Sequence, residues 1–237
     1  MNIMNRRFFL AFILLVGMMA GFTACSENTG DEEEYKDWQQ VNAKYFNDIF
    51  AKALLNEDGR WDTIRCWSLN DTVAKLNPTS YIVVHKEEDG AGSGCPMYTD
   101  SVMVHNFGKL LPSLTYTNGY VIEKSWDGIG GLKLSDDPAQ NYEMDFQKYN
   151  PATAVAKKWA VGGLIDGYTT ALMRMHIGDR WRVYVPWTLG YGTTDYNSIP
   201  GYSVLVWDIK LLGYYHPGAD IPSTDAKKHD AALWITE

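Results

Sequence analysis

Hydrophobic residues follow two periodicities along this chain, and the change between them falls near residue 80. Over residues 35–55 they recur at spacings of three and four, which places them on one face of a helix. Residues 56–59 end that pattern, and a weaker helical spacing runs from Trp61 to Leu76. We therefore expect residues 35–79 to form a helical extension that packs on the domain behind it. A partner-binding role for its apolar face is the alternative.

From residue 80 onward, short β-type segments alternate with turn residues. Expected strands begin at Tyr81, Ser101, Tyr120, Arg180 and Ser203. One helical spacing interrupts them, over residues 164–175, and residues 126–153 are rich in Gly, Asp, Pro and Asn, as expected of a surface insertion with a short strand at 142–146. The sum predicts an α+β class: a largely antiparallel sheet with one short helix against it.

The N-terminus has the pattern of an export signal. Arg6 and Arg7 precede an apolar stretch from Phe8 to Met19, which is too short to span a bilayer comfortably. Small residues then lead to Cys25, and the string Phe22-Thr23-Ala24-Cys25 resembles a bacterial lipobox. We expect residues 1–24 to be a lipoprotein signal peptide and Cys25 to be acylated, which would give the chain a membrane anchor at the cell envelope. The alternative is an ordinary signal peptide followed by a free cysteine.

Both ends of the remaining chain are polar. Residues 25–34 are acidic and have too few apolar side chains for a core, so we expect a solvated tether. That tether is similar to the surface-export signal of Bacteroidetes lipoproteins, and a plain spacer is the other interpretation. Residues 216–237 are predicted to form a polar C-terminal tail.

Composition narrows the function classes. The formal net charge is −8 and no Lys/Arg run occurs, which argues against nucleic acid as a partner. The five histidines lack metal-binding spacing, and no phosphate-binding or nucleophile-elbow motif occurs, so hydrolase and nucleotide chemistry have no support. Cys66 and Cys95 would be free to pair in an oxidising compartment, but sequence does not give their separation.

A series of motifs in the second half is specific. In order they are Gly167-Tyr168, Ala171-Leu172, Met175, Gly178-Asp179-Arg180-Trp181, Tyr184-Val185-Pro186, Leu189-Gly190-Tyr191-Gly192, Ile199-Pro200 and Leu205-Val206-Trp207-Asp208-Ile209. Together they resemble the C-terminal half of an FKBP domain, a family of peptidyl-prolyl cis/trans isomerases. Matches to the N-terminal half are weaker: Val102 to Leu110 and Gly119 to Ser125. The resemblance covers about residues 80–215, with 126–153 enlarging a loop.

The resemblance implies a twisted antiparallel sheet wrapped around one short helix, no cofactor and no metal. It also implies proline-containing polypeptides as substrates and macrolides as inhibitors. The implied catalytic residues are Tyr168 at the pocket floor, Tyr191 as a hydroxyl donor and Trp207 on the last strand. The positions implied to bind substrate are Leu164, Ile165, Ile199, Ile122, Glu123, Asn106 and Trp159, with a shift of two residues possible at the last.

Three of these positions depart from the family pattern. Asn106 replaces a tyrosine, Ile122 a phenylalanine and Glu123 an aspartate. Two lost aromatic rings open one wall of the pocket. Two functions therefore remain: an active isomerase that assists exported proteins, and a non-catalytic peptide-binding or holdase module with the same fold. Each of the apolar site residues also has a purely structural interpretation as part of the core.

Overall fold

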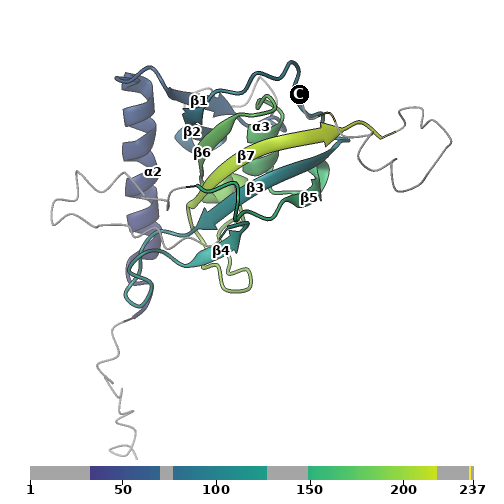
Figure 1. The fold of residues 1–237 in the computed structure, drawn as a ribbon. Helices are drawn as coiled ribbons and strands as arrows, with labels where there is room; N and C mark the ends of the chain where they lie inside the picture. The colour runs from purple at the N-terminus through teal and green to yellow at the C-terminus, as the bar shows by residue number, and fades with distance from the viewer. Residues whose placement is uncertain (1–32, 70–76, 127–148, 218–234, 236–237) are drawn as a thin grey trace, which may run out of the picture. The chain divides into compact units, whose positions relative to one another are not determined.

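The computed structural model describes residues 33–69, 77–126, 149–217 and 235 (Figure 1). The described residues from Glu34 onward form one compact unit. The signal peptide with Cys25, most of the tether, the predicted strand at 142–146 and nearly all of the tail lie outside the described residues. Among the residues described, no helix is long and apolar enough to cross a membrane.

Seven antiparallel strands make one sheet in the order β1-β2-β6-β7-β3-β4, with β5 also pairing with β3. Within the described ranges, two α-helices accompany it, α2 (Trp38–Leu55) and α3 (Asp166–Leu172). The strands are β1 (Trp61–Arg65), β2 (Tyr81–Glu88), β3 (Ser101–Lys109), β4 (Val121–Lys124), β5 (Lys157–Ala160), β6 (Arg180–Val185) and β7 (Leu205–Tyr215). The expected α+β class with one short helix against an antiparallel sheet is confirmed.

The two helices lie on opposite faces of the sheet. On β6, Val185 contacts α3 so closely that a Cβ on Gly167 would lie 2.3 Å from its Cγ1. The neighbouring Tyr184 points to the other face, where its ring stacks on Trp61 at 5.9 Å and meets Tyr45 of α2 at 6.3 Å. Side chains alternate along a strand, so β6 separates two layers. We call the α3 side the inner face and the α2 side the outer face.

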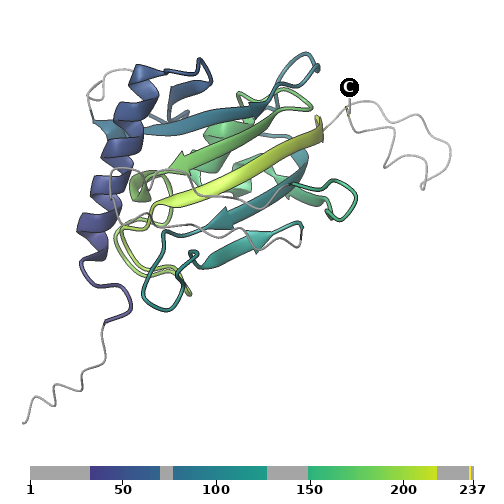
Figure 2. The same ribbon diagram turned by 60° about the vertical axis from the view of Figure 1, so that its left-hand side comes forward.

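α2 is an integral part of this fold. Both views show it crossing the strands at one side of the sheet (Figures 1 and 2). The indole of Trp38 donates to Ser203 Oγ at 2.9 Å, and Asn42 Oδ1 accepts the Val204 N–H at 2.7 Å. The helix's own residues Phe46 and Ile49 are fully buried against the sheet side of the domain core. The expectation that this helix packs on the domain is met, because both bonds tie it to the segment that leads into β7.

The second predicted helix, from Trp61 to Leu76, is wrong over its first part. Residues 61–65 form β1 and pair with β2, for example Thr63 with Val83, while residues 70–76 lie outside the described structure. The side chain of Trp61 lies on the outer face against Tyr184, whereas that of Ile64 lies on the inner face. Side chains in this segment therefore alternate between faces, as in a strand, because pairing with β2 overrides the helical spacing of its apolar residues. The sheet therefore starts well before residue 80, where the domain was expected to begin.

Candidate functional site

An apolar cavity of about 360 Å³ opens on the inner face beside α3. We call it the aromatic hollow. Tyr168 of α3 and Trp207 of β7 meet there edge to face, with ring centroids 5.2 Å apart, and Trp159 of β5 meets Tyr168 at 5.9 Å. The complete lining is Ile122, Glu123, Trp159, Gly163, Leu164, Ile165, Tyr168, Tyr191, Tyr196 and Trp207.

Strand alternation and one glycine place Trp207 in the hollow. Trp207 pairs with Val183 across β6 and with Gly108 across β3, so all three side-chain positions point inward. A Cβ on Gly108 would lie 2.2 Å from Trp207 Cζ3, so only glycine lets the indole lie flat against β3. Glycine here is required by close approach.

Tyr191 and Tyr196 form the rim. Their rings stack nearly parallel, with centroids 4.5 Å apart and an interplanar angle of 9°. Tyr191 follows the 3-10 turn Trp187–Leu189, and Gly192 beside it has φ of 81°, a conformation that favours glycine. Burial and the neighbouring Tyr196 raise the pKa of Tyr191. Its hydroxyl therefore stays protonated at neutral pH and is available as a donor.

The wall opposite the rim is partly charged. Ile122 and Glu123 reach the hollow from β4, and Glu123 pairs with Lys157 of β5 at 3.1 Å. Both side chains of the pair are more than a third exposed, so the pair contributes little to stability. It adds a charged contact at a position where the family pattern has an aspartate, beside Ile122, where that pattern has a phenylalanine.

Two polar atoms at the floor lack partners among the described residues. Tyr168 Oη and Trp207 Nε1 are buried without a hydrogen bond. Burial, with Glu123 and Asp208 nearby, raises the pKa of Tyr168 well above its usual value, so this hydroxyl also stays neutral. A buried donor without an acceptor costs about 1–3 kcal/mol, and such costs are concentrated at sites of function.

Most of the predicted site residues come together in the hollow, and two do not. Asn106 is fully buried and is not among the residues that line the hollow; its Oδ1 accepts a hydrogen bond from Ser125 Oγ at 2.8 Å. Ile199 lines a separate cavity across the Tyr196–Ile199 bridge. Tyr196 and Gly163 line the hollow but were not predicted; the close spacing of Tyr196 to Tyr191 was the only available signal.

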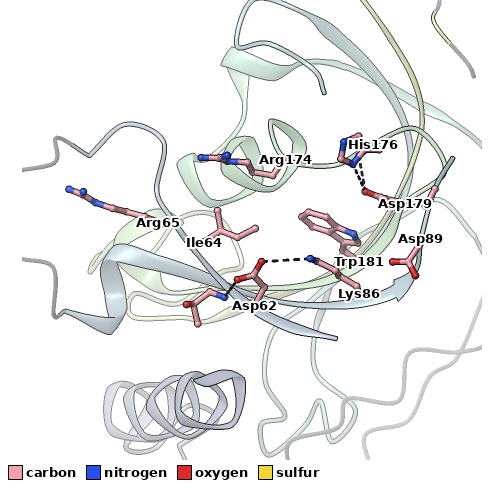
Figure 3. Close-up of a pocket in the computed structure, with 11 residues that line it drawn as sticks. Asp62, Ile64, Arg65, Lys86, Asp89, Arg174, His176, Asp179 and Trp181 are labelled. Atoms are coloured by element: carbon pink, nitrogen blue, oxygen red, sulfur yellow. Dashed lines mark hydrogen bonds and ion pairs between the residues drawn. The ribbon is translucent and has the colours of Figure 1, made fainter. Parts of the chain in front are cut away.

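Other groups show no second reactive centre within the described part of the chain. Cys66 and Cys95 are both free thiols, and burial raises the pKa of Cys95. No group of His, Cys, Asp or Glu among these residues is arranged to hold a metal ion. A larger cavity, about 520 Å³, lies between β1 and the turn after α3 (Figure 3). Its lining mixes both signs of charge, including the pair Lys86–Asp62 at 3.7 Å; we call it the charged cleft.

Comparison with known proteins agrees with this geometry. Residues 96–212 match the family model described as FKBP-type peptidyl-prolyl cis-trans isomerase. The chain is 27% identical over 220 residues to the isomerase FkpA of Aeromonas hydrophila, covering 91% of this chain and 68% of that protein. It is 40% identical over 89 residues to a probable 25 kDa isomerase of Pseudomonas aeruginosa, which is 37% of this chain and 39% of that protein.

A crystal structure of a peptidyl-prolyl isomerase from Pseudomonas syringae pv. tomato aligns with a TM-score of 0.47 and 16% identity, over 75% of this chain and 96% of that one. The family match contains β3 to β6 and most of β7, and so the strands and the helix that enclose the aromatic hollow. Over residues 96–212, just under half of its length, this chain matches the family of FKBP-type peptidyl-prolyl cis-trans isomerases.

Proposed function

We propose that this chain catalyses cis/trans isomerisation of X–Pro bonds in polypeptides exported to the cell envelope. The observation that carries the proposal is the aromatic hollow, where Tyr168, Trp159 and Trp207 form a ring-lined cavity with two neutral hydroxyl donors. Proline's ring is compact and apolar, so such a cavity fits it better than a charged one.

The chemistry needs no nucleophile and no proton transfer. Twisting an amide costs about 18–20 kcal/mol because resonance is lost, and X–Pro bonds have cis and trans forms within ~0.5–1 kcal/mol. The twisted amide has less charge separation than the planar one, so an apolar cavity favours it. Any interaction that is stronger with the twisted form lowers the barrier by that difference.

The residues have distinct roles in this account. Tyr168 and Trp207 hold the proline ring, Leu164 and Ile165 close the apolar wall, and the Tyr191 hydroxyl donates to a substrate carbonyl. Ile122, Glu123 and Trp159 shape the remaining wall. Macrolide inhibitors of the family would occupy the same cavity and compete with substrate.

The location at the envelope rests on the sequence. The export signal over residues 1–24 and the lipobox-like Cys25 support a lipid anchor, and the acidic residues 25–34 would space the domain from the bilayer. A mature N-terminus that starts at an acylated Cys25, measured by mass spectrometry of protein from membranes, tests this part.

The activity is tested by the rate at which a proline tetrapeptide converts from cis to trans. We expect acceleration above the buffer rate that a macrolide suppresses, and roughly a hundredfold lower kcat/KM in Trp207→Ala that remains folded by circular dichroism. Conversion at the buffer rate at high protein concentration would contradict the proposal.

A non-catalytic peptide-binding or holdase role is the second candidate. Asn106 favours it, because the position that would supply an aromatic wall is instead buried in a hydrogen bond with Ser125. This role predicts saturable binding of unfolded chains and suppression of their aggregation with no change in isomerisation rate. The same tetrapeptide experiment separates the two functions.

A further inference from the structure

A second cavity, of about 440 Å³, lies next to the aromatic hollow. The tight hairpin that closes with the Tyr196–Ile199 bridge separates the two: Tyr196 lines the aromatic hollow, while residues 197–200 line the second cavity. Both hydrogen bonds of that bridge are 2.9 Å long, so the dividing wall is well defined. We call the second cavity the tyrosine hollow; its lining is Glu34, Tyr35, Tyr116, Tyr120, Asp195, Asn197, Ser198, Ile199 and Pro200.

The tyrosine hollow combines aromatic rings with carboxylates of one sign. Tyr116 and Tyr120 meet edge to face at 5.0 Å, and Tyr35 adds a third ring. Glu34 and Asp195 are its charged residues, and no Lys, Arg or His is among the described residues that line it. Rings and carboxylates around one space are the surroundings that attract a cationic side chain.

Both carboxylates are held in place. Ser113 and the backbone N–H of Thr115 donate to Glu34, and these bonds lower the pKa of Glu34. Gly201 N–H donates to Asp195 Oδ1 at 2.9 Å, which fixes the loop after the hairpin. Both carboxylates therefore have defined positions in the lining of the tyrosine hollow.

The tyrosine hollow adjoins the aromatic hollow, and its charged lining residues are both acidic. We therefore propose that it is a subsite for a lysine or arginine side chain of the same polypeptide whose proline occupies the aromatic hollow. This inference rests on the proposed function and names a substrate preference for it. Neighbouring strands lie ~4.8 Å apart, and an extended chain advances ~3.3 Å per residue. The hairpin between the two cavities is two strand spacings wide, or about 10 Å. An extended substrate spans that distance in about three residues, so the cationic residue would lie about three residues from the proline.

The charged cleft provides a contrast on the same molecule. There Lys86 pairs with Asp62 and His176 lies 3.6 Å from Asp179 (Figure 3). Asp89, Arg65 and Arg174 also line the cleft, so acids and bases offset one another. Asp89 is well exposed and pairs with Arg60 at 3.3 Å. Asp89→Asn thus removes one negative charge from the protein without changing the tyrosine hollow, and serves as a control for the loss of a distant charge.

The experiment uses proline peptides with a single lysine placed two to five residues from the proline on either side, each paired with a norleucine peptide. We expect the lysine peptide about three residues away to have a roughly fivefold lower KM than its norleucine partner, an advantage that falls as salt is added. Asp195→Asn combined with Glu34→Gln should remove that advantage, while Asp89→Asn should leave it unchanged.

A second readout keeps this inference separate from the isomerase proposal. The same peptides with alanine in place of proline are titrated while NMR follows the Ile199 methyl groups and the rings of Tyr116 and Tyr120. Absence of turnover with every peptide would overturn the isomerase, and a lysine preference in these titrations would still support the subsite. Equal KM values and equal shifts for lysine and norleucine at every position would overturn the subsite, whatever the turnover.

Discussion

The two faces of β6 and β7 differ in what their buried polar side chains meet: a cavity on the inner face and an ion-pair network on the outer face. On the inner face, Trp207 and Tyr168 keep buried polar atoms without hydrogen bonds in the described structure. One residue along β7, on the outer face, Asp208 accepts two bonds from Arg180, at 2.8 and 2.6 Å. Lys210 and Glu88 extend that ion-pair network.

Neighbouring residues of β7 therefore have different roles: Asp208 on the outer face contributes to stability, and Trp207 on the inner face contributes to binding. The outer network fixes buried charges against each other, which makes it costly to disturb. The inner face has a cavity and unpaired donors, so a ligand there gains bonds that the free protein does not make. Changes to the outer face should therefore alter folding, and changes to the inner face should alter catalysis.

The largest expected effect is on the outer face. Asp208→Ala leaves the guanidinium of Arg180, which is only 13% exposed, without its main partner. We expect a loss of about 3–5 kcal/mol in the free energy of unfolding, measured by urea denaturation. Glu88→Gln, at a side chain 42% exposed, should cost less than about 1 kcal/mol. Equal losses in both variants would contradict the ranking.

A smaller effect is expected from crowding the inner face. Gly108→Ala places a Cβ 2.2 Å from Trp207 Cζ3 and forces the indole to move. Overpacking of this kind costs about 1–3 kcal/mol, and we expect kcat/KM to fall roughly tenfold as the hollow changes shape. Gly163→Ala, whose Cβ would meet nothing within 4 Å, adds a methyl group to the lining of the hollow without displacing Trp207 and serves as the comparison. An unchanged isomerisation rate in Gly108→Ala would argue against Trp207 as part of the site.

Removing one hydroxyl tests the donor at the rim. Tyr191→Phe keeps the ring that stacks on Tyr196 but loses the bond to the substrate carbonyl. A hydrogen bond of this kind contributes about 0.5–1.5 kcal/mol, so kcat/KM should fall by up to about tenfold with little change in unfolding free energy. The matched variant Tyr196→Phe should retain nearly full activity. The reverse pattern would assign the donor to Tyr196.

The smallest effect concerns pH and the outer face. Hydrogen bonds to Glu87 at 3.0 Å and Asp58 at 2.8 Å raise the pKa of His85 above its unfolded value of ~6.5. Its contribution to stability is then fully present below the unfolded pKa and is lost as pH rises through the folded one. His85→Gln should destabilise the protein by about 0.5–1 kcal/mol at pH 5.5 and by less at pH 8.5. A pH-independent difference in denaturation would contradict the charge on His85.

Sequence was sufficient where one strong local pattern agreed with packing. β7 was predicted because apolar residues alternate from Leu205 to Leu211, and the same alternation placed Trp207 on the buried face. The short helix around Tyr168 was predicted from its spacing, and the structure brings both rings together at 5.2 Å. Family motifs added most of the remaining lining of the hollow.

Sequence was insufficient where contacts between distant segments decide the outcome. β1 is a strand because it pairs with β2 under α2, and no spacing within residues 61–65 shows that pairing. Asn106 and Ile199 match positions that line the pocket in the family pattern. In this structure Asn106 is hydrogen-bonded to Ser125, and the hairpin places Ile199 in the lining of the neighbouring tyrosine hollow. The outer ion pairs join β2, β6 and β7, and the charges of Asp208 and Arg180 did not reveal their partners.

Exchange spectroscopy on a proline peptide tests the central claim most directly, because it measures cis/trans interconversion and the contact surface in one sample. We predict cis/trans exchange cross-peaks that appear only with protein present, together with shifts confined to the Trp207 indole N–H and the rings of Tyr168 and Tyr191. No exchange above the peptide alone, or shifts centred on the charged cleft, would contradict the account.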